Sequence, residues 1–282
     1  MLARPECAGA QRYFAWLYSP ARVRVVIESL FGIEEEIRAA LRPGLEHRVA
    51  HLRLEWWREE CARIAADRPV HPLGEALRGC RATEMAGLID NAAWDLAGAP
   101  FATRAELDRY CARWADALVV PLARAGAAAE QRPAEEAATF ARRAGAALCE
   151  SELLAQLARA AEHGCARLPL DELAQAGVEP AALTRRPWPQ QLAELVRARE
   201  GALRAALAGS LGALVPAAQP AARGLIVWAA LTARASRRRE SALPVPPAPH
   251  ALRALADGWH AWRAARSAER GRGFEHLTET LA

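Results

Sequence analysis

Three consecutive carboxylates, Glu34, Glu35 and Glu36, lie in the stretch VVIESLFGIEEEIRAALRP, and two arginines, Arg38 and Arg42, follow them. Clustered carboxylates can hold Mg²⁺, which prefers oxygen ligands and positions phosphate groups for transfer. On a helix, residues three or four apart are neighbours, so Glu34 and Glu35 can each pair with Arg38. The pattern therefore allows either a metal site or a solvated helix face, and the solvated face is the default expectation for these glutamates.

A second distinctive stretch, HLRLEWWREE, places two adjacent tryptophans, Trp56 and Trp57, between arginine and glutamate residues. Successive residues of a helix point about 100° apart, so the two rings cannot share one face. We expect one ring to enter the core and the other to pack on a neighbouring helix or to line a cavity.

Several familiar catalytic patterns are absent from the sequence. The sequence has no G-x-S-x-G elbow, phosphate-binding loop or dinucleotide fingerprint. No zinc-ligand spacing relates five of the histidines to one another, namely His51, His71, His163, His250 and His260. The six cysteines are scattered without a C-x-x-C pair, so we expect reduced and mostly buried thiols at Cys7, Cys61, Cys80, Cys111, Cys149 and Cys165.

The charge pattern argues against a nucleic-acid partner. All 37 basic residues are arginines, and they are interleaved with 33 acidic residues to give a formal net charge of +4. Apart from RASRRRE at 234–240, the chain has no basic block, whereas nucleic-acid binders usually gather positive charge on one face.

Membrane contact is expected to be peripheral at most. The N-terminus lacks a secretory apolar core, and the apolar run from Gly224 is about half of the ~20 residues that cross a bilayer. Near the C-terminus, Trp259 and Trp262 alternate with arginines, which fits a helix that packs on the bundle or, alternatively, one that lies on a membrane. We expect a cytoplasmic protein, at most peripheral to the inner face of the membrane.

The elements that must position these residues are helices. Alanine, leucine and arginine favour helix, and proline and glycine divide the chain into amphipathic segments. We predict an all-α single domain over residues 1–282, with about ten helices around one core and a tail that frays from about residue 271. The expected helices cover 8–17, 21–41, 46–66, 83–94, 103–126 (with a capping box from Thr103 and Glu106), 133–163, 188–214, 220–238 and 250–266, with short ones after 72 and near 168–180.

Several of these stretches, in the same order, resemble the bacterial squalene/phytoene synthase family. They are RYFAWLYSPARVRVVIESLFGIEEEIR, LRLEWWREE, HPLGEAL, LIDNAAWDLAGAPFATRAELDRYCARWADAL and HGCARLPLDELAQAGV, and together they span about residues 12–238. The resemblance implies an isoprenoid-synthase fold, a helical bundle around a deep central apolar cavity. It also implies head-to-head condensation of two prenyl diphosphates, with Mg²⁺ held by two aspartate-rich motifs on facing helices.

At both metal-binding motifs the sequence departs from this family. The resemblance places the first aspartate pair at Arg38 and Arg42, and the second pair at Gln156 and Ala160. None of these side chains is an anionic ligand, so we expect no metal and no other cofactor. A displaced Mg²⁺ site stays open as an alternative, with the carboxylates Glu28, Glu35, Glu150 and Glu152.

Other positions of the family are retained. Tyr110 matches a tyrosine that lies near the reacting carbons in active relatives and is the candidate catalytic residue, although a core tyrosine would look the same. Trp114 and Asp116 stand where the family has small residues facing the cavity, so they can fill part of it. The candidate substrate-binding residues are Arg22, Arg24, Arg38, Arg42, Trp56 and Asp95.

Three functions are compatible with these observations. The first, favoured by the reversed charge at the motifs, is a non-catalytic family member that binds or assembles a protein partner. The second is an active head-to-head prenyltransferase of the phytoene or squalene synthase type, which would need Mg²⁺. The third is a binder of a prenyl diphosphate, isoprenoid or other lipid in the central cavity. Enzymatic activity, substrate chain length and oligomeric state stay open.

Overall fold

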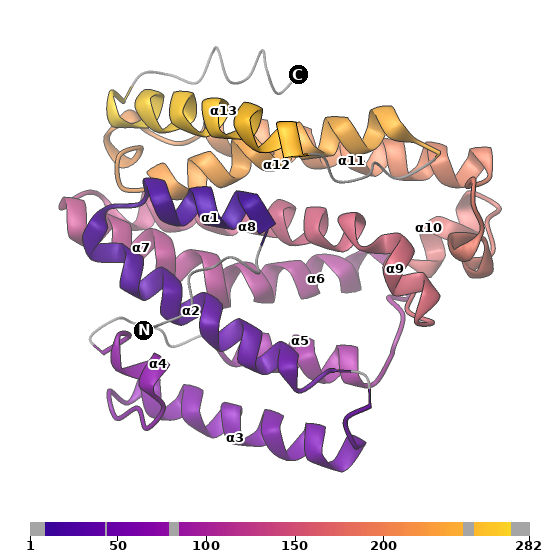
Figure 1. Ribbon diagram of the computed structural model, residues 1–282, viewed down its shortest axis with the longest axis horizontal. Coiled ribbons are helices and arrows are strands. Elements are labelled where there is room, and N and C mark those ends of the chain that lie inside the picture. Colours follow the sequence, from indigo (N-terminus) through magenta and orange to yellow (C-terminus); the bar gives the residue numbers. More distant parts are fainter. Residues whose placement is uncertain (1–8, 43, 79–84, 245–250, 272–282) are drawn as a thin grey trace.

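Helices lie side by side in layers across the molecule, from α13 at one edge to α3 at the other, in the computed structural model (Figure 1). The structure describes residues 9–42, 44–78, 85–244 and 251–271, and for residues 9–10 and 251–255 it describes the backbone alone. Within these ranges every regular element is a helix. The all-α fold class is therefore confirmed.

Ten of the helices in the described residues are ten residues long or more, in agreement with the expected number. The short helices α4, α9 and α10 have only 4, 6 and 6 residues. In chain order the α-helices are α1 (Gly9–Tyr18), α2 (Ala21–Ala39), α3 (His47–Ala65), α4 (Pro72–Glu75), α5 (Ala86–Leu96), α6 (Arg104–Trp114), α7 (Val120–Glu130), α8 (Ala134–Ala155), α9 (Leu157–Glu162), α10 (Leu170–Gln175), α11 (Gln190–Gly212), α12 (Arg223–Ala242) and α13 (Ala251–Glu269).

The helix expected at 103–126 consists of α6, a π-helical turn η2 over Ala115–Val119, and α7, which continues to Glu130. Pro121 has no N–H to donate to the carbonyl four residues earlier, which interrupts regular α-helical bonding at this place. Single π-turns inside longer helices often occur near functional sites. Here the turn follows directly after Trp114, a residue of the central cluster described below.

The capping box predicted at the start of α6 is only half formed. The Thr103 side chain makes no cap hydrogen bond, whereas the backbone N–H of Ala102 donates to Glu106 at 2.6 Å. The backbone N–H of Arg104 donates instead to Asp171 at 3.3 Å, and Asp171 lies in α10. A tertiary contact thus replaces the cap that the local sequence predicts.

Two glycines let the central helices approach closely. A Cβ on Gly145 of α8 would lie 2.7 Å from the Cβ of Ala115 in η2, and a Cβ on Gly224 of α12 would lie 2.5 Å from the carbonyl oxygen of Ala15 in α1. Neither distance is tolerated by a real side chain. Glycine at 224 therefore lets α1 lie directly on α12, which brings one face of α1 into the bundle.

A large hydrophobic cluster runs through the bundle from α1 to α12. A second, smaller cluster joins α12 to α13 through Val227, Ala230, Leu231, Ala261, Ala264 and Ala265. The assignment of residues 1–282 to one domain stays a prediction, and beyond Gly271 the tail expected to fray lies outside the described residues. None of the helices that the structure describes combines the length and hydropathy needed to cross a bilayer.

We expect Gly224→Ala to lower the free energy of unfolding by about 1–3 kcal/mol, because the added methyl group overpacks the crossing of α1 and α12. Urea denaturation measures this change. The matched control is Gly209→Ala in α11, where a Cβ meets nothing within 4 Å. There, alanine is expected to leave stability unchanged or raise it by up to about 1 kcal/mol, and equal effects of the two substitutions would contradict the close contact.

Candidate functional site

Arg12 of α1 is buried inside the bundle, with an exposed fraction of only 3%. Its Nε and Nη2 atoms donate to the two carboxylate oxygens of Glu152 in α8, at 2.9 and 2.7 Å. Its Nη1 atom donates to Glu34 in α2, and Glu34 is also buried. One guanidinium therefore bridges two carboxylates from two helices that lie far apart in the sequence.

Two further donors complete the coordination of Glu34. Arg38, one turn later in α2, donates to Glu34 Oε1 at 2.7 Å, and the indole N–H of Trp114 donates to the same oxygen at 2.8 Å. Arg38 also lies 3.4 Å from Glu152 Oε2. Two arginines thus balance two glutamates, and we call Arg12, Glu34, Arg38 and Glu152 the central ion-pair cluster.

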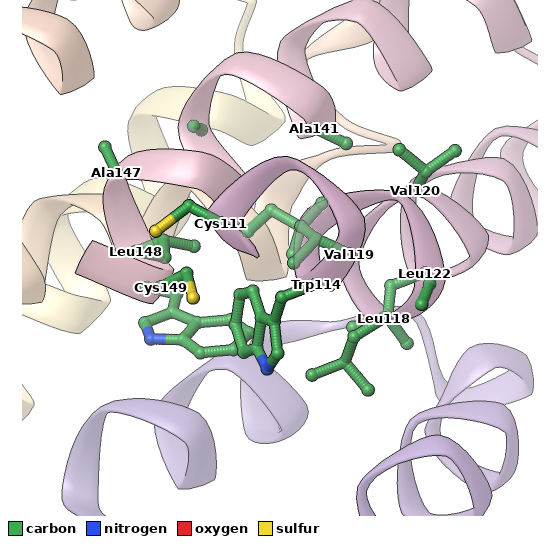
Figure 2. Close-up of a cluster of buried hydrophobic side chains, with 14 of the residues drawn as sticks. Cys111, Trp114, Leu118, Val119, Val120, Leu122, Ala141, Ala147, Leu148 and Cys149 are labelled. Carbon is green, nitrogen blue, oxygen red and sulfur yellow. The ribbon is translucent and has the colours of Figure 1, made fainter. Parts of the chain in front are cut away.

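Aromatic rings surround the buried end of this cluster. The Cζ atom of Arg12 lies 5.0, 5.5 and 5.2 Å from the ring centroids of Phe31, Trp114 and Trp228. Trp228 meets Trp114 and Phe31 edge to face, with centroids 5.9 and 5.7 Å apart. Figure 2 shows Trp114 in the hydrophobic core, near Cys149 and Leu118. Such rings attract a guanidinium through their negative faces and exclude water from it.

The charges of the cluster hold one another in their ionised forms. Burial alone would raise the pKa of Glu34, but the charges of Arg12 and Arg38 and the hydrogen bonds from Arg12 and Trp114 lower this pKa to about 2. The pKa of Arg12 is raised: burial opposes this shift, but the carboxylates of Glu152 and Glu34 outweigh burial. Arg12 and Glu34 are therefore both ionised at neutral pH.

Both carboxylates of the cluster lie one helical turn before the positions that the family resemblance assigns to metal binding. Glu34 precedes Arg38 by four residues, and Glu152 precedes Gln156 by four. α8 ends at Ala155, Gln156 is exposed at the break, and Ala160 lies beyond it in α9. The helix expected at 133–163 is thus divided at the second motif position.

The expectation of a solvated glutamate face is correct for Glu35 and Glu36 but wrong for Glu34 and Glu150, which are buried. A buried carboxylate is tolerated where cations and hydrogen-bond donors surround it. Glu35 pairs with Arg42 at 3.8 Å instead of with Arg38. Sequence periodicity alone did not distinguish these two buried glutamates from the other glutamates.

The four carboxylates of the displaced metal register have separate partners. Glu28 accepts from the indole N–H of Trp16 at 2.8 Å. Glu150 binds the guanidinium groups of Arg104 and Arg199, whereas Glu35 and Glu152 pair with the arginines named above. In the described parts of the chain, no three or more His, Cys, Asp or Glu side chains converge as metal ligands would. The structure does not bring this register together.

Tyr110, the candidate catalytic residue, is buried and bonded to a second ion pair. Its hydroxyl donates to Asp95 Oδ2 at 3.0 Å, and Arg167 donates to the other oxygen of Asp95. Burial first, and then the charge of Asp95, raise the pKa of Tyr110 well above its usual value. Asp95 lies in the last turn of α5 rather than in a loop. Tyr110 and Asp95 are therefore brought together, with Arg167 as a partner that sequence reasoning missed.

The remaining arginine candidates lie outside the central cluster. Arg22 is exposed on α2, and Arg42 near its end is exposed beside Glu35. Arg24 donates to the carbonyl oxygens of Leu17 at 2.7 Å and Ser19 at 3.3 Å, so it caps the end of α1. Only Arg38 among the four arginine candidates takes part in the cluster.

The tryptophan expectations hold in part. Trp57 is buried, whereas Trp56 is 40% exposed and meets Trp57 edge to face at 5.1 Å. Trp114 fills space inside the bundle, as expected. Asp116 does not, because it pairs with Arg142 at 3.2 Å near the surface.

The five histidines considered above leave out His47, which lies four residues before His51 and gives the H-x-x-x-H spacing of two ligands on one helix face. Their Nε2 atoms are 3.0 Å apart on the exposed face of α3. Two imidazoles without a third ligand nearby among the described residues do not make a zinc site.

Cys61, Cys111 and Cys149 are buried thiols, as expected, and burial raises the pKa of Cys61 to about 12. Cys165 is partly exposed, and Cys7 and Cys80 lie outside the described residues.

Arg12, the residue at the centre of the site, was missed by sequence reasoning. The signal that could have found it is its spacing, because Arg12 shares one face of α1 with the buried residues Ala15 and Ser19. An arginine on the buried face of a short helix needs an acidic partner elsewhere in the fold. The sequence alone does not say which of the many glutamates that partner is.

Comparison with known proteins relates this fold to a family of isoprenoid enzymes. The family model for squalene/phytoene synthase matches residues 9–251. A crystal structure of a dehydrosqualene synthase in complex with ligand has 13% sequence identity and a TM-score of 0.75, with 93% of this chain and 94% of that chain covered. Squalene synthase HpnC from Alicyclobacillus acidocaldarius has 14% identity and a TM-score of 0.56, with 95% and 88% covered. A search of curated proteins found no match.

We expect Arg12→Met to lower the free energy of unfolding by about 3–5 kcal/mol, because it leaves the buried Glu34 and the partly buried Glu152 with Arg38 as their remaining arginine partner. Urea denaturation followed by circular dichroism measures the loss. Arg22→Met on the exposed side of α2 is the matched control and should stay within about 0.5 kcal/mol of the wild type. A loss for Arg12→Met no larger than that of the control would show that the cluster does not stabilise the fold.

The lowered pKa of Glu34 also predicts how stability depends on acid. Because the folded-state pKa of about 2 lies below the ordinary glutamate value of 4.5, the ion pair contributes fully to stability above pH 4.5, and this contribution is lost as the pH falls towards 2. We expect the stability difference between the wild type and Glu34→Gln to shrink by on the order of 3 kcal/mol across this window. The control is Glu36→Gln, and a difference for Glu34→Gln that is independent of pH would contradict the assignment.

Proposed function

The chain belongs to the squalene/phytoene synthase family, and from this premise we propose that it is a non-catalytic member that binds or assembles a protein partner. The observation that carries the proposal is Arg12, whose guanidinium lies between the two carboxylates that α2 and α8 present to each other. In an active relative, the resemblance implies facing acidic residues at this end of the bundle. Here the facing acids are already neutralised by arginine.

The donor set at the motif positions does not fit Mg²⁺. This ion takes oxygen ligands in near-octahedral geometry, and in the active family it would neutralise the departing diphosphate. Arg38 and Arg42 are cations, Ala160 has no ligand atom, and Gln156 offers one neutral amide oxygen. Glu34 and Glu152, one turn away, are engaged with Arg12 and Arg38 at 2.7–2.9 Å or less. A metal ion would have to displace a buried guanidinium to reach them.

Tyr110, which matches the catalytic tyrosine of the family, takes part in hydrogen bonds that hold the fold together. The Tyr110 hydroxyl is bonded to Asp95, and Asp95 is bonded to Arg167 from the segment after α9. These bonds tie α5, α6 and that segment together. Retention of Tyr110 is therefore explained by packing and hydrogen bonding, without a reacting carbon beside it.

Lipid binding inside the bundle receives less support than a protein-binding role. A small interior cavity lined by residues of α1, α2, α7 and α12, among them Phe31 and Leu122, has a volume of about 10 Å³. That volume is roughly one water molecule, whereas sites for small ligands measure hundreds of Å³. Trp114, Trp228 and Arg12 occupy the neighbouring space. This cavity is therefore too small to hold a prenyl or acyl chain.

We expect the purified full-length protein to release no diphosphate and form no product from farnesyl or geranylgeranyl diphosphate in the presence of Mg²⁺. Chromatography of the extracted lipids and a phosphate-release assay measure both outcomes. An active enzyme of the family, assayed in parallel, shows that substrates and conditions are sound. Circular dichroism shows that the protein is folded.

Turnover above the reaction without enzyme would overturn the non-catalytic proposal and favour the prenyltransferase alternative. A stoichiometric isoprenoid or acyl chain extracted from the purified protein would instead favour the lipid-binding alternative. Neither result would change the family assignment, which rests on the match over residues 9–251.

A further inference from the structure

The helix α13 lies at the outer edge of the molecule and contacts the bundle through α12 and α1 (Figure 1). Its inner face is made of small side chains: Ala261, Ala264 and Ala265 pack on Val227 and Leu231 in the smaller hydrophobic cluster. Its outer face is different, because Trp259 and Trp262 are 58% and 43% exposed. The packing expected for this C-terminal helix is therefore present, but it does not involve the tryptophans.

The two exposed tryptophans form one apolar surface. Their rings are stacked, with centroids 5.1 Å apart and an angle of 25° between the planes. The guanidinium of Arg266 lies 6.0 Å from the ring centroid of Trp262. Large aromatic side chains gathered on the surface usually mark a place where something else binds. Tryptophan in particular favours the boundary between water and the lipid headgroups, where its apolar ring and polar N–H are both accommodated.

Three exposed arginines share the outer face with this pair. With about 100° per residue, positions 259, 262, 263, 266 and 270 fall within roughly 100° of one another around the helix axis. Arg263 and Arg270 lie one and three turns after Trp259, and Arg266 lies between them. The acidic residues of α13 are paired: Asp257 is buried against Arg238 at 2.8 Å, and Glu269 is shared between Arg223 at 3.1 Å and Arg266 at 3.6 Å.

The positive charge of the whole chain is concentrated at this edge. Residues 223–271, which contain α12 and α13, have nine arginines and three acidic residues, a formal charge of +6. The complete chain carries +4, so the rest of the chain is slightly negative. The arginines of the basic block in α12 are partly buried, and Arg238 and Arg239 pair with Asp257 and Glu200. The exposed arginines at this edge are therefore those of α13.

We propose that the outer face of α13 docks flat on an anionic phospholipid membrane, with Trp259 and Trp262 at the headgroup level and Arg263, Arg266 and Arg270 on lipid phosphates. A helix with aromatic and arginine side chains on one face binds membranes by burying apolar area and by attraction to anionic lipids. A second copy of this chain is a poorer occupant, since a symmetric contact would oppose arginine to arginine. The proposal is independent of whether the protein is catalytic.

The direct experiment is co-sedimentation of the full-length protein with vesicles. Vesicles of phosphatidylcholine mixed with phosphatidylglycerol are expected to bind the protein at least tenfold more tightly than vesicles of phosphatidylcholine alone. Added salt should weaken the binding, because it screens the arginine–phosphate attraction. Replacing one of Arg263, Arg266 or Arg270 by glutamine is expected to lower the affinity roughly fivefold.

The tryptophan pair provides the sharper test. Trp259→Ala with Trp262→Ala is expected to weaken binding to the anionic vesicles at least tenfold, because the apolar contribution is lost. The matched control is Trp56→Ala on α3, at the opposite edge of the bundle, where the ring is 40% exposed and binding should be unchanged. Circular dichroism confirms that both variants are folded.

Three results would overturn the proposal. One is wild-type protein that does not sediment with anionic vesicles, and another is equal binding to neutral and anionic vesicles. The third is a Trp259/Trp262 double variant that binds as tightly as the Trp56 control. A fluorescence titration with duplex DNA tests whether the arginine face binds nucleic acid. Tight DNA binding without vesicle binding would assign this face to nucleic acid instead of to a membrane.

Discussion

A guanidinium group that leaves water needs acceptors for its N–H groups, and Arg12 finds them in Glu34 and Glu152, which come from different helices. Because the guanidinium is planar, its N–H groups can donate to one carboxylate along each edge while aromatic rings cover its two faces. Meeting this requirement fixes several helices at once. Gly224 must let α1 lie on α12, and Trp114 must supply the last donor to Glu34.

The central ion-pair cluster gives α2 and α8 a different relation from the one implied for an active synthase. Two helices that present unpaired acids at the same level repel each other until a cation lies between them. In this chain the cation is an arginine of the protein, so the helices are held together without a metal ion being required for charge balance. The charged side chains at the centre of the bundle consequently pair with one another. The outer face of α13, with its two exposed tryptophans, is a distinctive part of the surface.

Helix positions were predictable because amphipathic periodicity and proline punctuation are local. The segments expected at 46–66 and 188–214 match α3 and α11 to within two residues at each end. Helical geometry also predicted that only one of the two adjacent tryptophan rings enters the core, but it did not say that the buried ring is Trp57. Glu34 was misplaced on a solvated face, because nothing local distinguishes it from Glu35. Its burial depends on Arg12, and Arg12 is joined to Glu152 across 140 positions of sequence.

The sequence by itself determined the helical fold class and the family, because composition, periodicity and motif order are properties of the chain alone. It also led to the prediction that Arg38, Arg42, Gln156 and Ala160 stand at the metal-binding positions of the family. Only the tertiary structure decided which carboxylates are buried, which arginine neutralises them and which tryptophans face solvent. The physical reason is that charge compensation and exposure depend on distances between helices. Those distances are set when α1, α2, α8 and α12 pack together, so they cannot be deduced from a local sequence pattern.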